Sequence, residues 1–507
     1  MDYLSMTKQQ LEDLTIFELR SAGRSVGVAS PASLNKASLI EKILNIASGV
    51  EKPSAPSKRG RPAKYVNFAP PQPENPAFAQ TPAPVLSTAA KEFVKPPVEE
   101  KRVFKPFDHA PFPRQETVFT PLTEEEDIRE GVLDIHTDGY GFIRVRNCEH
   151  SEKDVYVAAL KIKKAGLRRG DLVKCYTKVN HDNKPSALID IISINGEPPE
   201  AMERRPNFDD LVPIYPDKRL KLETKGSARD FAIRCIDLIA PIGKGQRAMI
   251  VSPPKAGKTT LLKQIAASIS TNYPDVTLLV LLVDERPEEV TDMKRSIKGE
   301  VIYSTFDEMP EHHTKAAELL LSRAKRLVEL GKDVVILMDS LTRLARAYNL
   351  TIPPTGRTLS GGIDPGALHS PKRFFGSARN IERGGSLTII ATALVDTGSR
   401  MDDVIYEEFK GTGNMEIHLD RKLSEKRIFP AIDLAKSGTR KEELLLTPKE
   451  LEGIWAFRKV LSSGDTAEAT ETLLNMMVKT NTNQEFIEQL LLNLRNWQKE
   501  GFLLRKS

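Results

Sequence analysis

Unbroken apolar runs alternate with segments of helical periodicity in the second half of the chain. Four such runs span residues 247–251, 276–283, 333–338 and 386–393. A strand buried on both faces of a parallel sheet needs a continuous apolar run, whereas a half-exposed strand alternates apolar and polar positions. From about residue 237 onward, the pattern therefore predicts an α/β fold in which parallel strands and helices follow one another.

The preceding part of the chain, residues 130–195, has a different pattern of short alternating runs separated by turn residues. We expect strands at 131–135, 141–145, 154–157, 172–178 and 187–194. Five short strands within about 65 residues are typical of a small closed barrel of the OB type. Residues 196–230, which follow, are rich in proline and polar residues and are expected to form a connector.

Helical periodicity predicts a small helical unit at each end of the chain. Residues 7–48 carry two apolar stripes at helical spacing, with Asn35 and Ser38 as candidate N-caps. From Pro448 onward the helical spacing returns, and we expect its large apolar side chains to pack in a core. These side chains are Trp455, Met476, Met477 and Trp497.

Residues 51–114 break both patterns and hold 14 of the 34 prolines. Such a composition cannot bury enough apolar surface to offset the entropy of the chain, so a disordered, semi-extended linker is expected. The segment has 11 Lys+Arg and 6 Asp+Glu, a surplus of +5 that equals the net charge of the whole chain. The remaining residues sum to zero, so any nucleic-acid binding by the folded parts must come from individually placed residues. The basic run 58–61 is either a solvated stretch or an extra RNA contact.

Cysteine content and hydropathy indicate whether the protein is disulfide-rich, membrane-spanning or secreted. Cys148, Cys175 and Cys235 are too few and too scattered for a disulfide framework, so reduced thiols are expected. No apolar run reaches the roughly 18 residues of a membrane span. The N-terminal residues lack the layout of a signal peptide. These features predict a cytoplasmic protein with no membrane partner.

A phosphate-binding loop follows the first apolar run. Residues 252–259 read Ser-Pro-Pro-Lys-Ala-Gly-Lys-Thr, a P-loop whose first glycine is replaced by Ser252. Backbone N–H groups of the loop and of the next helix can still cradle phosphates. Lys258 would reach the β and γ phosphates, and Thr259 would offer its hydroxyl to Mg²⁺. A chance match is the alternative, but the strand–loop–helix context argues against it.

Two other apolar runs end in acidic residues, at Asp284-Glu285 and at Asp339. The C-terminal ends of parallel strands meet at one edge of a sheet, so these acids are expected to lie near the P-loop. One could hold the Mg²⁺ shell while the other polarises the attacking water, and spacing does not decide which. The alternative is that either acid merely caps the helix that follows.

Six motifs occur in a fixed order along the chain. They span residues 241–247, 253–259, 284–291, 339–349, 371–376 and 409–414, and include Asp-Glu-Arg-Pro-Glu-Glu-Val-Thr and Asp-Ser-Leu-Thr-Arg-Leu-Ala-Arg-Ala-Tyr-Asn. Together they closely resemble the bacterial transcription termination factor Rho family, from about residue 131 to at least residue 446. The resemblance implies a RecA-like homohexameric ring that is an RNA-dependent ATPase and a 5′-to-3′ RNA–DNA helicase. It also implies nascent single-stranded RNA and the RNA polymerase elongation complex as partners, and ATP and Mg²⁺ as cofactors.

The same resemblance implies roles for individual residues of the ATP site. Glu285 would be the base that activates water, and Asp339 would join Thr259 in the metal shell. Arg440, with Arg427 as a second such arginine, would act as an arginine finger from the adjacent subunit; a surface helix cap is the alternative for Arg440. The implied ATP contacts are Gly243, Lys244, Gly245, Gln246, Arg247, Ala248, Lys255, Ala256, Gly257, Lys258, Thr259, Thr260, Arg286 and Phe429, with Phe429 stacking on the adenine.

The barrel carries a candidate RNA surface. Tyr140 and Phe142 are two residues apart, so on a strand they share one face and could form a stacking platform, unless they belong to the barrel core. The resemblance favours the platform, adds Tyr156, and places Arg144 beside it. Residues 183–188 lack the acidic–aromatic pair usual in the family, so we expect a relaxed or shifted base preference.

Two flexible loops resemble the family's RNA-contacting loops in the ring channel. The implied contacts are Arg357, Thr358, Gly361, Gly362, Ser399 and Arg400. Other members have Lys where Arg357 and Arg400 stand, and arginine keeps the phosphate-binding charge while adding a bidentate fork.

The predicted fold class is α/β, with a RecA-like P-loop ATPase core preceded by a five-stranded OB/cold-shock-like barrel. The predicted division is 1–50 helical unit, 51–125 linker, 126–196 barrel, 197–230 connector, 231–446 ATPase domain and 447–507 C-terminal helical subdomain. Two rival functions remain: a rotary ATP-synthase catalytic subunit, and a non-enzymatic RNA-binding regulator with a degenerate nucleotide domain. RNA stimulation of ATP hydrolysis discriminates among the three.

Overall fold

The computed structural model describes residues 35–48 and 126–499 except 148, 179–184, 203–204, 227 and 462–465, together with residues 11, 19, 22, 26 and 28. The predicted linker with its basic run, Cys148, Asn183 and Lys184 lie outside the described residues. The chain divides into two compact units, residues 1–113 and 114–507. Within the described residues, no helix combines the length and the apolar character needed to cross a membrane.

The first unit contains helix α3 (Lys36–Ala47). The Asn35 side chain accepts a hydrogen bond from the backbone N–H of Ser38 at 2.9 Å, so the predicted Asn35 cap is confirmed and Ser38 lies inside the first turn. Leu39, Ile40 and Ile43 lie on one side of the helix and are buried. They pack with Leu11, Leu19, Ala22 and Val28 in a small core of their own.

The second unit begins with a closed barrel whose strand order is β1-β2-β3-β5-β4. The strands are β1 (Glu126–Ile135), β2 (Gly141–Arg144), β3 (Val155–Val157), β4 (Leu172–Lys178) and β5 (Ser186–Ile194), with helix α4 (Ala159–Lys164) after β3. All five predicted strands are confirmed. In β2, Gly141 and Ile143 are buried while Phe142 and Arg144 are partly exposed, so alternation places the aromatic residue on the outer face.

The rest of the unit is built on one mixed sheet. Its main path is β14-β13-β7-β12-β10-β8-β9, with β6 and β11 attached beside β12. The strands are β6 (Pro213–Ile214), β7 (Arg247–Ser252), β8 (Thr277–Glu285), β9 (Glu300–Thr305), β10 (Asp333–Asp339), β11 (Arg379–Ile381), β12 (Ser386–Leu394), β13 (Met415–Leu419) and β14 (Ile432–Thr439). The four predicted apolar strands are confirmed as β7, β8, β10 and β12, which lie together in the middle of the path. Among these, the ladders are parallel.

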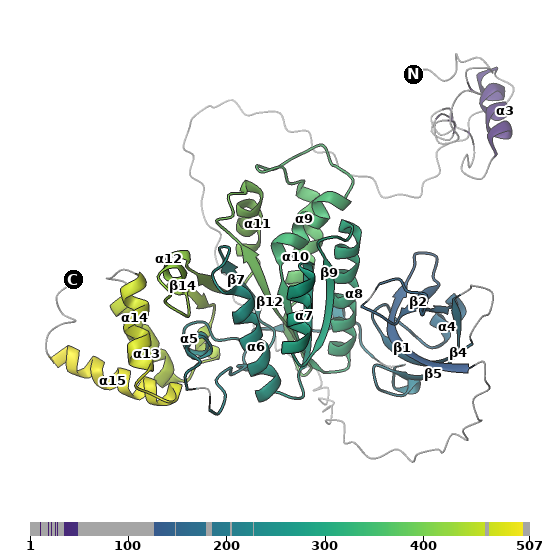
Figure 1. The fold of residues 1–507 in the computed structure, drawn as a ribbon. Helices are drawn as coiled ribbons and strands as arrows, with labels where there is room; N and C mark the ends of the chain where they lie inside the picture. Colours follow the sequence, from purple (N-terminus) through teal and green to yellow (C-terminus); the bar gives the residue numbers. More distant parts are fainter. Residues whose placement is uncertain are drawn as a thin grey trace, which may run out of the picture. The chain divides into compact units, whose positions relative to one another are not determined.

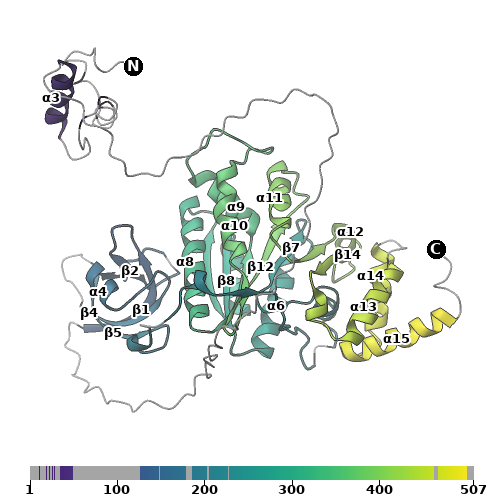
Figure 2. The ribbon, with the colours of Figure 1, turned by 180° about the vertical axis from the view of Figure 1, so that it is seen from behind.

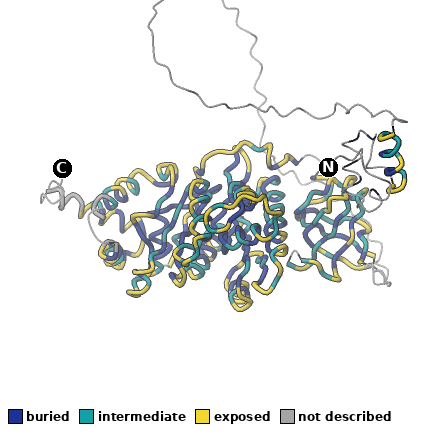
Figure 3. Tube along the Cα trace, turned by 90° about the horizontal axis from the view of Figure 1, so that it is seen from above, coloured by how far each residue is buried: buried dark blue, intermediate teal, exposed yellow. Residues whose placement is uncertain are grey.

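Helices cover both faces of this sheet (Figures 1 and 2). They are α5 (Phe231–Ile239), α6 (Lys258–Asn272), α7 (Pro287–Ser296), α8 (Pro310–Glu329), α9 (Leu341–Thr351), α10 (His369–Gly376), α11 (Arg400–Lys410) and α12 (Arg421–Glu425). Successive residues of β8 belong to opposite cores: Leu278 and Val280 pack with α5 and α6, whereas Leu279 and Leu281 pack with α8 and α9. Burial on both faces explains why these strands are apolar throughout. In Figure 3, buried positions run through the interiors of the barrel and of the sheet domain.

The segment between the barrel and the sheet packs more closely than a simple connector. Two short 3₁₀ helices, Pro199–Met202 and Phe208–Asp210, are followed by β6, which pairs with β11. Phe208, Leu220 and Leu222 are fully or almost fully buried. The segment is therefore part of the packed structure of the second unit.

Three helices close the described chain: α13 (Pro448–Leu461), α14 (Thr466–Met477) and α15 (Asn483–Lys499). Met477 is buried and Met476 partly buried, as predicted, but Trp455 is 56% exposed and that expectation is wrong. The buried side of α13 is formed by Ile454 and Phe457, so Trp455 points away from the core and its indole N–H donates to Glu442 at 2.8 Å. The side chain of Trp497 is outside what the structure describes.

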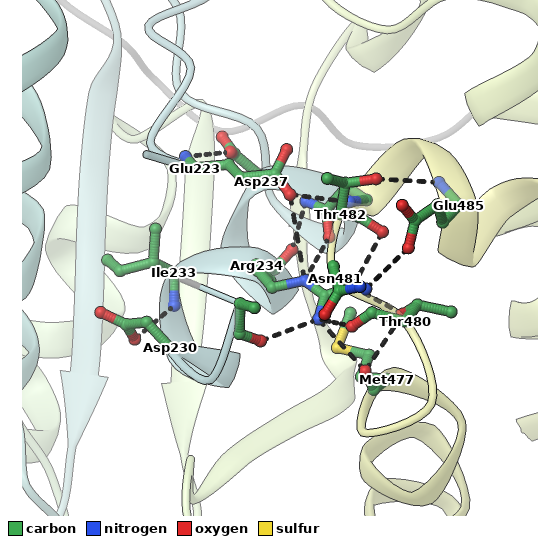
Figure 4. Close-up of polar contacts among 12 residues, drawn as sticks. Glu223, Asp230, Ile233, Arg234, Asp237, Met477, Thr480, Asn481, Thr482 and Glu485 are labelled. Atoms are coloured by element: carbon green, nitrogen blue, oxygen red, sulfur yellow. Dashed lines mark hydrogen bonds and ion pairs between the residues drawn. The ribbon is translucent and has the colours of Figure 1, made fainter. Parts of the chain in front are cut away.

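A fully buried arginine joins these helices to the sheet domain (Figure 4). Arg234 of α5 donates to backbone carbonyls of Met477, Thr480 and Thr482 at 2.8 to 3.1 Å, and to the side chains of Thr480 and Asn483. Asn483 returns a bond to the Arg234 carbonyl. One side chain thus fixes the turn between α14 and α15 to α5.

Candidate active site and RNA-binding surfaces

The P-loop leaves the C-terminal end of β7 and leads into α6, which begins at Lys258. Two carboxylates from neighbouring strands lie at the same sheet edge, since β10 pairs with β8 and brings Asp339 opposite Leu282. The Lys258 ammonium donates to Asp339 Oδ1 at 2.7 Å. The N-cap positions of the helices after these strands are held by Arg286 and Ser340, of which only Ser340 makes a side-chain capping bond, so neither Glu285 nor Asp339 is a helix cap.

Asp339 is buried, and only one of its two carboxylate oxygens has hydrogen-bond partners. Its Oδ1 accepts from Lys258 and from the Thr392 hydroxyl at 2.8 Å, whereas its Oδ2 is buried with no hydrogen-bond partner among the described groups. An orphaned carboxylate oxygen is costly unless water or a cation meets it. Carboxylate, hydroxyl and water oxygens are the ligands that Mg²⁺ prefers, and Thr259 is the second residue of the adjacent helix. The residues present therefore fit a magnesium ion.

Glu285 is 3% exposed at the end of β8, and its Oε2 accepts from the Arg343 guanidinium at 2.9 Å. Burial and the nearby charge of Asp339 raise the pKa of Glu285, while Arg343 and Lys258 oppose the rise, and the net result is a pKa of about 7. A general base works best when its pKa lies near the working pH. Glu285 has the environment that such a base needs.

Helix α9 contributes two arginines that the sequence reasoning did not single out. Arg343 contacts Glu285 and also donates to the Asp284 carbonyl. Arg346, one turn further, makes a bidentate pair with Asp402 at 2.7 and 2.9 Å. Asp402 also accepts from the Thr397 hydroxyl, at 2.6 Å. Their spacing could have indicated that Arg343 and Arg346 act from the same side of α9, because residues i and i+3 share a helix face.

A cavity of about 520 Å³ adjoins the P-loop. The predicted nucleotide contacts Ala256, Gly257, Thr260 and Phe429 line it, and Phe429 is 49% exposed. Residues that the sequence reasoning missed also line it: Arg229, Asp230, Phe231, Ala232, Leu261, Gln264, Leu419, Pro430, Ala431 and Ile432. Lys255 precedes Ala256 in the P-loop, and its carbonyl accepts a hydrogen bond from the Ser424 hydroxyl. Arg286 is exposed at the start of α7.

The structure does not bring the segment 243–248 to the P-loop. These residues precede or begin β7, whereas the P-loop follows its last residue, so the length of the strand, about 20 Å, separates them. Lys244 pairs with Asp333 at the start of β10, and the Gly245 N–H donates to Thr388. Gly243, Lys244, Gly245, Gln246, Arg247 and Ala248 therefore lie at the opposite edge of the sheet from the P-loop of the same chain, and their contact with ATP stays a prediction.

Arg440 lies at this opposite edge. Its backbone N–H donates to the Asn414 carbonyl, and the Asn414 side chain accepts from Gln246 at 2.7 Å. It lines a second cavity of about 450 Å³ together with Trp455. Arg427 is at the other end of β14, exposed and two residues from Phe429, so the structure separates the two predicted finger arginines.

Aromatic rings cluster on the outside of the barrel. Phe142 lies 6.0 Å from Tyr140 and 5.8 Å from Tyr156 between ring centroids, and His136, missed by the sequence reasoning, stacks on Tyr140 at 5.0 Å. None of these rings belongs to the barrel core. Arg144 is not free: it pairs with Asp154 at 2.7 Å and with Asp134, and its guanidinium lies 5.2 Å from the Phe142 ring centroid.

The two candidate channel loops touch one another. Arg357, Thr358 and Arg400 are exposed, while Gly361, Gly362 and Ser399 lie beside them. A Cβ atom on Gly361 would come within 2.8 Å of the Met401 backbone nitrogen, and its φ of +85° also favours glycine. The first loop can therefore pack on the start of α11 only with glycine at this position.

Two family models match separate parts of the chain. Residues 129–200 match the family model of the Rho termination factor RNA-binding domain, and residues 232–439 match that of the ATP synthase alpha/beta family nucleotide-binding domain. The chain is 55% identical over 399 residues to transcription termination factor Rho of Bacillus subtilis (strain 168), covering 77% of this chain and 92% of that protein. It is 58% identical over 368 residues to Rho of Aquifex aeolicus (strain VF5), covering 71% and 84%. Rho of Escherichia coli (strain K12) is 51% identical over 386 residues, covering 74% and 92%.

Proposed function

This chain belongs to the Rho family of transcription termination factors, and from that premise we propose how its residues couple ATP hydrolysis to RNA. It is an RNA-binding, ATP-hydrolysing protein of transcription termination. The observation that carries the mechanistic proposal is the meeting of Lys258, Asp339 and Glu285 at one sheet edge, in a chain that also bears an aromatic cluster on its barrel.

In the ATP site, Lys258 leaves Asp339 to bind the phosphates of ATP, and Phe429 packs on the adenine at the rim of the cavity. Thr259 and Asp339 would hold Mg²⁺, which supplies charge neutralisation on the phosphates when bound. Glu285, oriented by Arg343, accepts a proton from the attacking water. In this proposal Lys258, Glu285 and Asp339 act from the C-terminal ends of β7, β8 and β10, and Phe429 acts from the segment before β14.

Arg440 works on a neighbouring subunit. Because it lies a strand's length from its own P-loop, it can reach a nucleotide only in an assembly, and we assign it as the arginine finger of a homohexamer. The segment 243–248, joined to it through Asn414, would support this trans surface. Arg427, beside Phe429, would act at the pocket of its own chain.

RNA engages two surfaces in this proposal. Tyr140, Phe142 and Tyr156 stack on bases, while Arg144 holds Phe142 in place rather than binding phosphate. Arg357 and Arg400 contact the RNA backbone in the ring channel. Hydrolysis then moves RNA 5′ to 3′ through the ring, unwinds the RNA–DNA hybrid and releases the transcript from the RNA polymerase elongation complex in the cytoplasm.

An ATPase assay with and without single-stranded RNA tests the proposal. The translocase reading predicts strong stimulation by RNA, which Lys258→Ala abolishes. Hydrolysis at equal rates with and without RNA would support a rotary-type ATPase, and RNA binding without hydrolysis would support a regulator. Either result overturns the proposed coupling.

A further inference from the structure

A basic cavity of about 410 Å³ lies at the sheet edge opposite the P-loop. Four cationic side chains from four different elements line it: Arg169 after α4 in the barrel, Lys325 on α8, Arg373 on α10 and Arg379 on β11. Two carboxylates, Asp209 and Glu318, line it as well, so four positive and two negative charges leave a surplus of +2. We name this cavity the α8–α10 basic pocket.

The floor of the pocket holds two of its cations close together. Phe208 is 1% exposed, and the Lys325 ammonium and Arg379 guanidinium lie 4.9 and 4.7 Å from its ring centroid. Among the described residues, the carboxylate paired with Lys325 is that of Asp209, at 3.5 Å, and it is 80% exposed, so solvent weakens the pair. Burial lowers the pKa of Lys325, and Arg379 and Arg373 lower it further, against the effect of Asp209. An anion in the pocket would relieve this crowding of positive charge.

The third cation of the pocket, Arg373, is available to bind a ligand. Arg373 is exposed on α10, and in the part of the chain that the structure describes its guanidinium forms no hydrogen bond or ion pair. An arginine fork held near two other cations is suited to bidentate contact with a phosphate group.

The barrel is fitted tightly against α8 at this place. A Cβ atom on Gly170 would come within 2.3 Å of the Ser322 backbone, so only glycine allows the approach. Arg168 pairs with Glu329 at 3.0 Å, and Arg169 pairs with Glu318 at 3.3 Å. The pocket therefore lies at a closely packed contact between the barrel and the ATPase domain.

Polar contacts lead from the pocket to both RNA surfaces. On one side, Arg169 pairs with Asp134 at 3.0 Å, and Asp134 also pairs with Arg144 beneath Phe142. On the other side, Glu318 accepts from the Tyr348 hydroxyl at 3.1 Å. Tyr348 is on α9, the helix whose Arg346 holds Asp402 near the second channel loop.

We propose that the α8–α10 basic pocket binds phosphodiester groups of RNA on their way from the barrel to the channel. The inference rests on the proposed RNA-driven function and adds a third contact point to it. The pocket reads charge rather than sequence, because its lining offers arginine and lysine side chains but no exposed aromatic ring on which a base could stack. Two RNA surfaces with a basic pocket between them favour a polynucleotide over a free nucleotide as its occupant.

The test compares wild type, Arg373→Gln and Lys325→Gln with Lys449→Gln, an exposed α13 substitution that removes the same charge elsewhere. Equilibrium binding is measured for a long single-stranded RNA and for an oligomer of about four nucleotides, which spans only one OB-fold site. We expect about fivefold weaker binding of the long RNA by each pocket variant, with the slope of log K against log salt smaller by about 0.7 for each lost phosphate contact. The short oligomer and the control variant should be unaffected.

Three outcomes would overturn the proposal. The first is full affinity and an unchanged salt slope of Arg373→Gln for the long RNA. The second is equal weakening for both RNA lengths, which would indicate a general change in the barrel. The third is binding of inorganic tripolyphosphate to the pocket without competition from the long RNA, which would identify a free-anion site. If wild type itself binds no RNA, the proposed function fails instead, so the two failures are distinguishable. An unchanged thermal midpoint shows that each variant is folded.

Discussion

The proton on Glu285 is controlled by neighbours that act in opposite directions. Burial and the charge of Asp339 raise its pKa, the positive charges of Arg343 and Lys258 lower it, and the balance is a pKa of about 7. Arg343 is the direct partner at 2.9 Å, so it both orients the carboxylate and keeps part of it ionised at neutral pH. A change in any of these charges is expected to move the pH at which the base works.

This arrangement predicts a pH profile. Glu285 is ionised above a pH of about 7 and protonated below it, so kcat should fall about tenfold for each pH unit on the acid side. Arg343→Gln removes a charge that lowers the pKa, so the midpoint should move to higher pH. The measurement is ATPase kcat at saturating ATP and RNA between pH 5.5 and 9.

Glu285→Gln provides the complementary measurement. It should bind ATP normally in an equilibrium assay and hydrolyse none at any pH, while the surface variant Arg421→Gln keeps the wild-type profile. Normal turnover by Glu285→Gln, or a midpoint that moves down in Arg343→Gln, would show that the base has been assigned to the wrong residue.

Sequence reasoning found the residues whose signal is local. Lys258 and Thr259 belong to a P-loop, and Glu285 and Asp339 end apolar strands, so each is marked by its own neighbours in the chain. Thr392 and Arg343 were not found, because their partners Asp339 and Glu285 lie more than fifty positions away. Pairing of this kind depends on strand order, which one sequence does not display.

At the scale of elements, alternation within one short strand produces the proposed RNA surface. Gly141 and Ile143 face the barrel interior, so Phe142 must face outward, where Tyr140 and Tyr156 meet it. The Arg144–Asp154 pair then fixes the ring from beneath. A stacking platform formed in this way is rigid before RNA arrives.

Removing one ring should weaken RNA binding. Phe142→Ala is expected to cost about 2 kcal/mol, roughly thirtyfold in Kd, because base stacking on an aromatic ring is lost. Tyr176→Ala is the matched control, since Tyr176 is on β4 of the same barrel and outside the aromatic cluster. Filter binding with poly(C) and poly(U) measures both affinity and base preference. Equal affinity of Phe142→Ala and wild type would refute the platform, and a hundredfold advantage of poly(C) would refute the relaxed preference.

The Arg234 network predicts a large stability effect. Arg234→Met leaves several buried carbonyl groups without a donor, and loss of one partner from such a network costs about 3 kcal/mol. Arg421→Met, which removes an exposed i,i+4 pair, should cost less than about 0.5 kcal/mol. Urea unfolding measures both. Equal midpoints for the two variants would show that the buried contacts contribute nothing net.

In the sheet, the strands whose residues are buried on both faces were predicted, whereas strands that mix buried and exposed residues were missed. The doubly buried strands β7, β8, β10 and β12 were found from their unbroken apolar runs. In contrast, β13 alternates buried and partly exposed residues over five positions, and β9 begins with a charged residue and a partly exposed one. The proline and polar content of segment 196–230 predicts a connector, and its apolar residues, among them Phe208, Leu220 and Leu222, give no periodic pattern that would indicate their burial.

At the scale of the whole molecule, the two halves of the proposed active site lie on opposite edges of one sheet. The P-loop follows β7, and Arg440 lies beside the residues that precede it. A single chain therefore presents its P-loop on one side and the proposed finger, Arg440, on the other. Such a surface pair is heterologous, and it closes into a ring when the rotation between subunits allows.

Mixing two inactive variants tests this arrangement. Lys258→Ala and Arg440→Ala should each lack RNA-stimulated ATPase activity, but mixed rings contain interfaces that join an intact P-loop to an intact finger. Activity should therefore return on mixing, since an arginine finger is worth roughly 10³ to 10⁵ in rate. Lys258→Ala mixed with Glu285→Gln is the control, because both defects lie in the same pocket and no interface is complete. No recovery with Arg440→Ala would mean that the finger acts within its own chain or not at all.

The exposed indole of Trp455 makes this assembly visible without a label. It is one of two tryptophans in the chain, it shares a cavity with Arg440, and more than half of its surface is open to water. In a Trp497→Phe background it is the sole tryptophan emitter. Docking of a second subunit on that edge would move the ring from water into protein and shift its emission to shorter wavelength. Ring closure could then be followed in real time, on the same samples used for the mixing experiment.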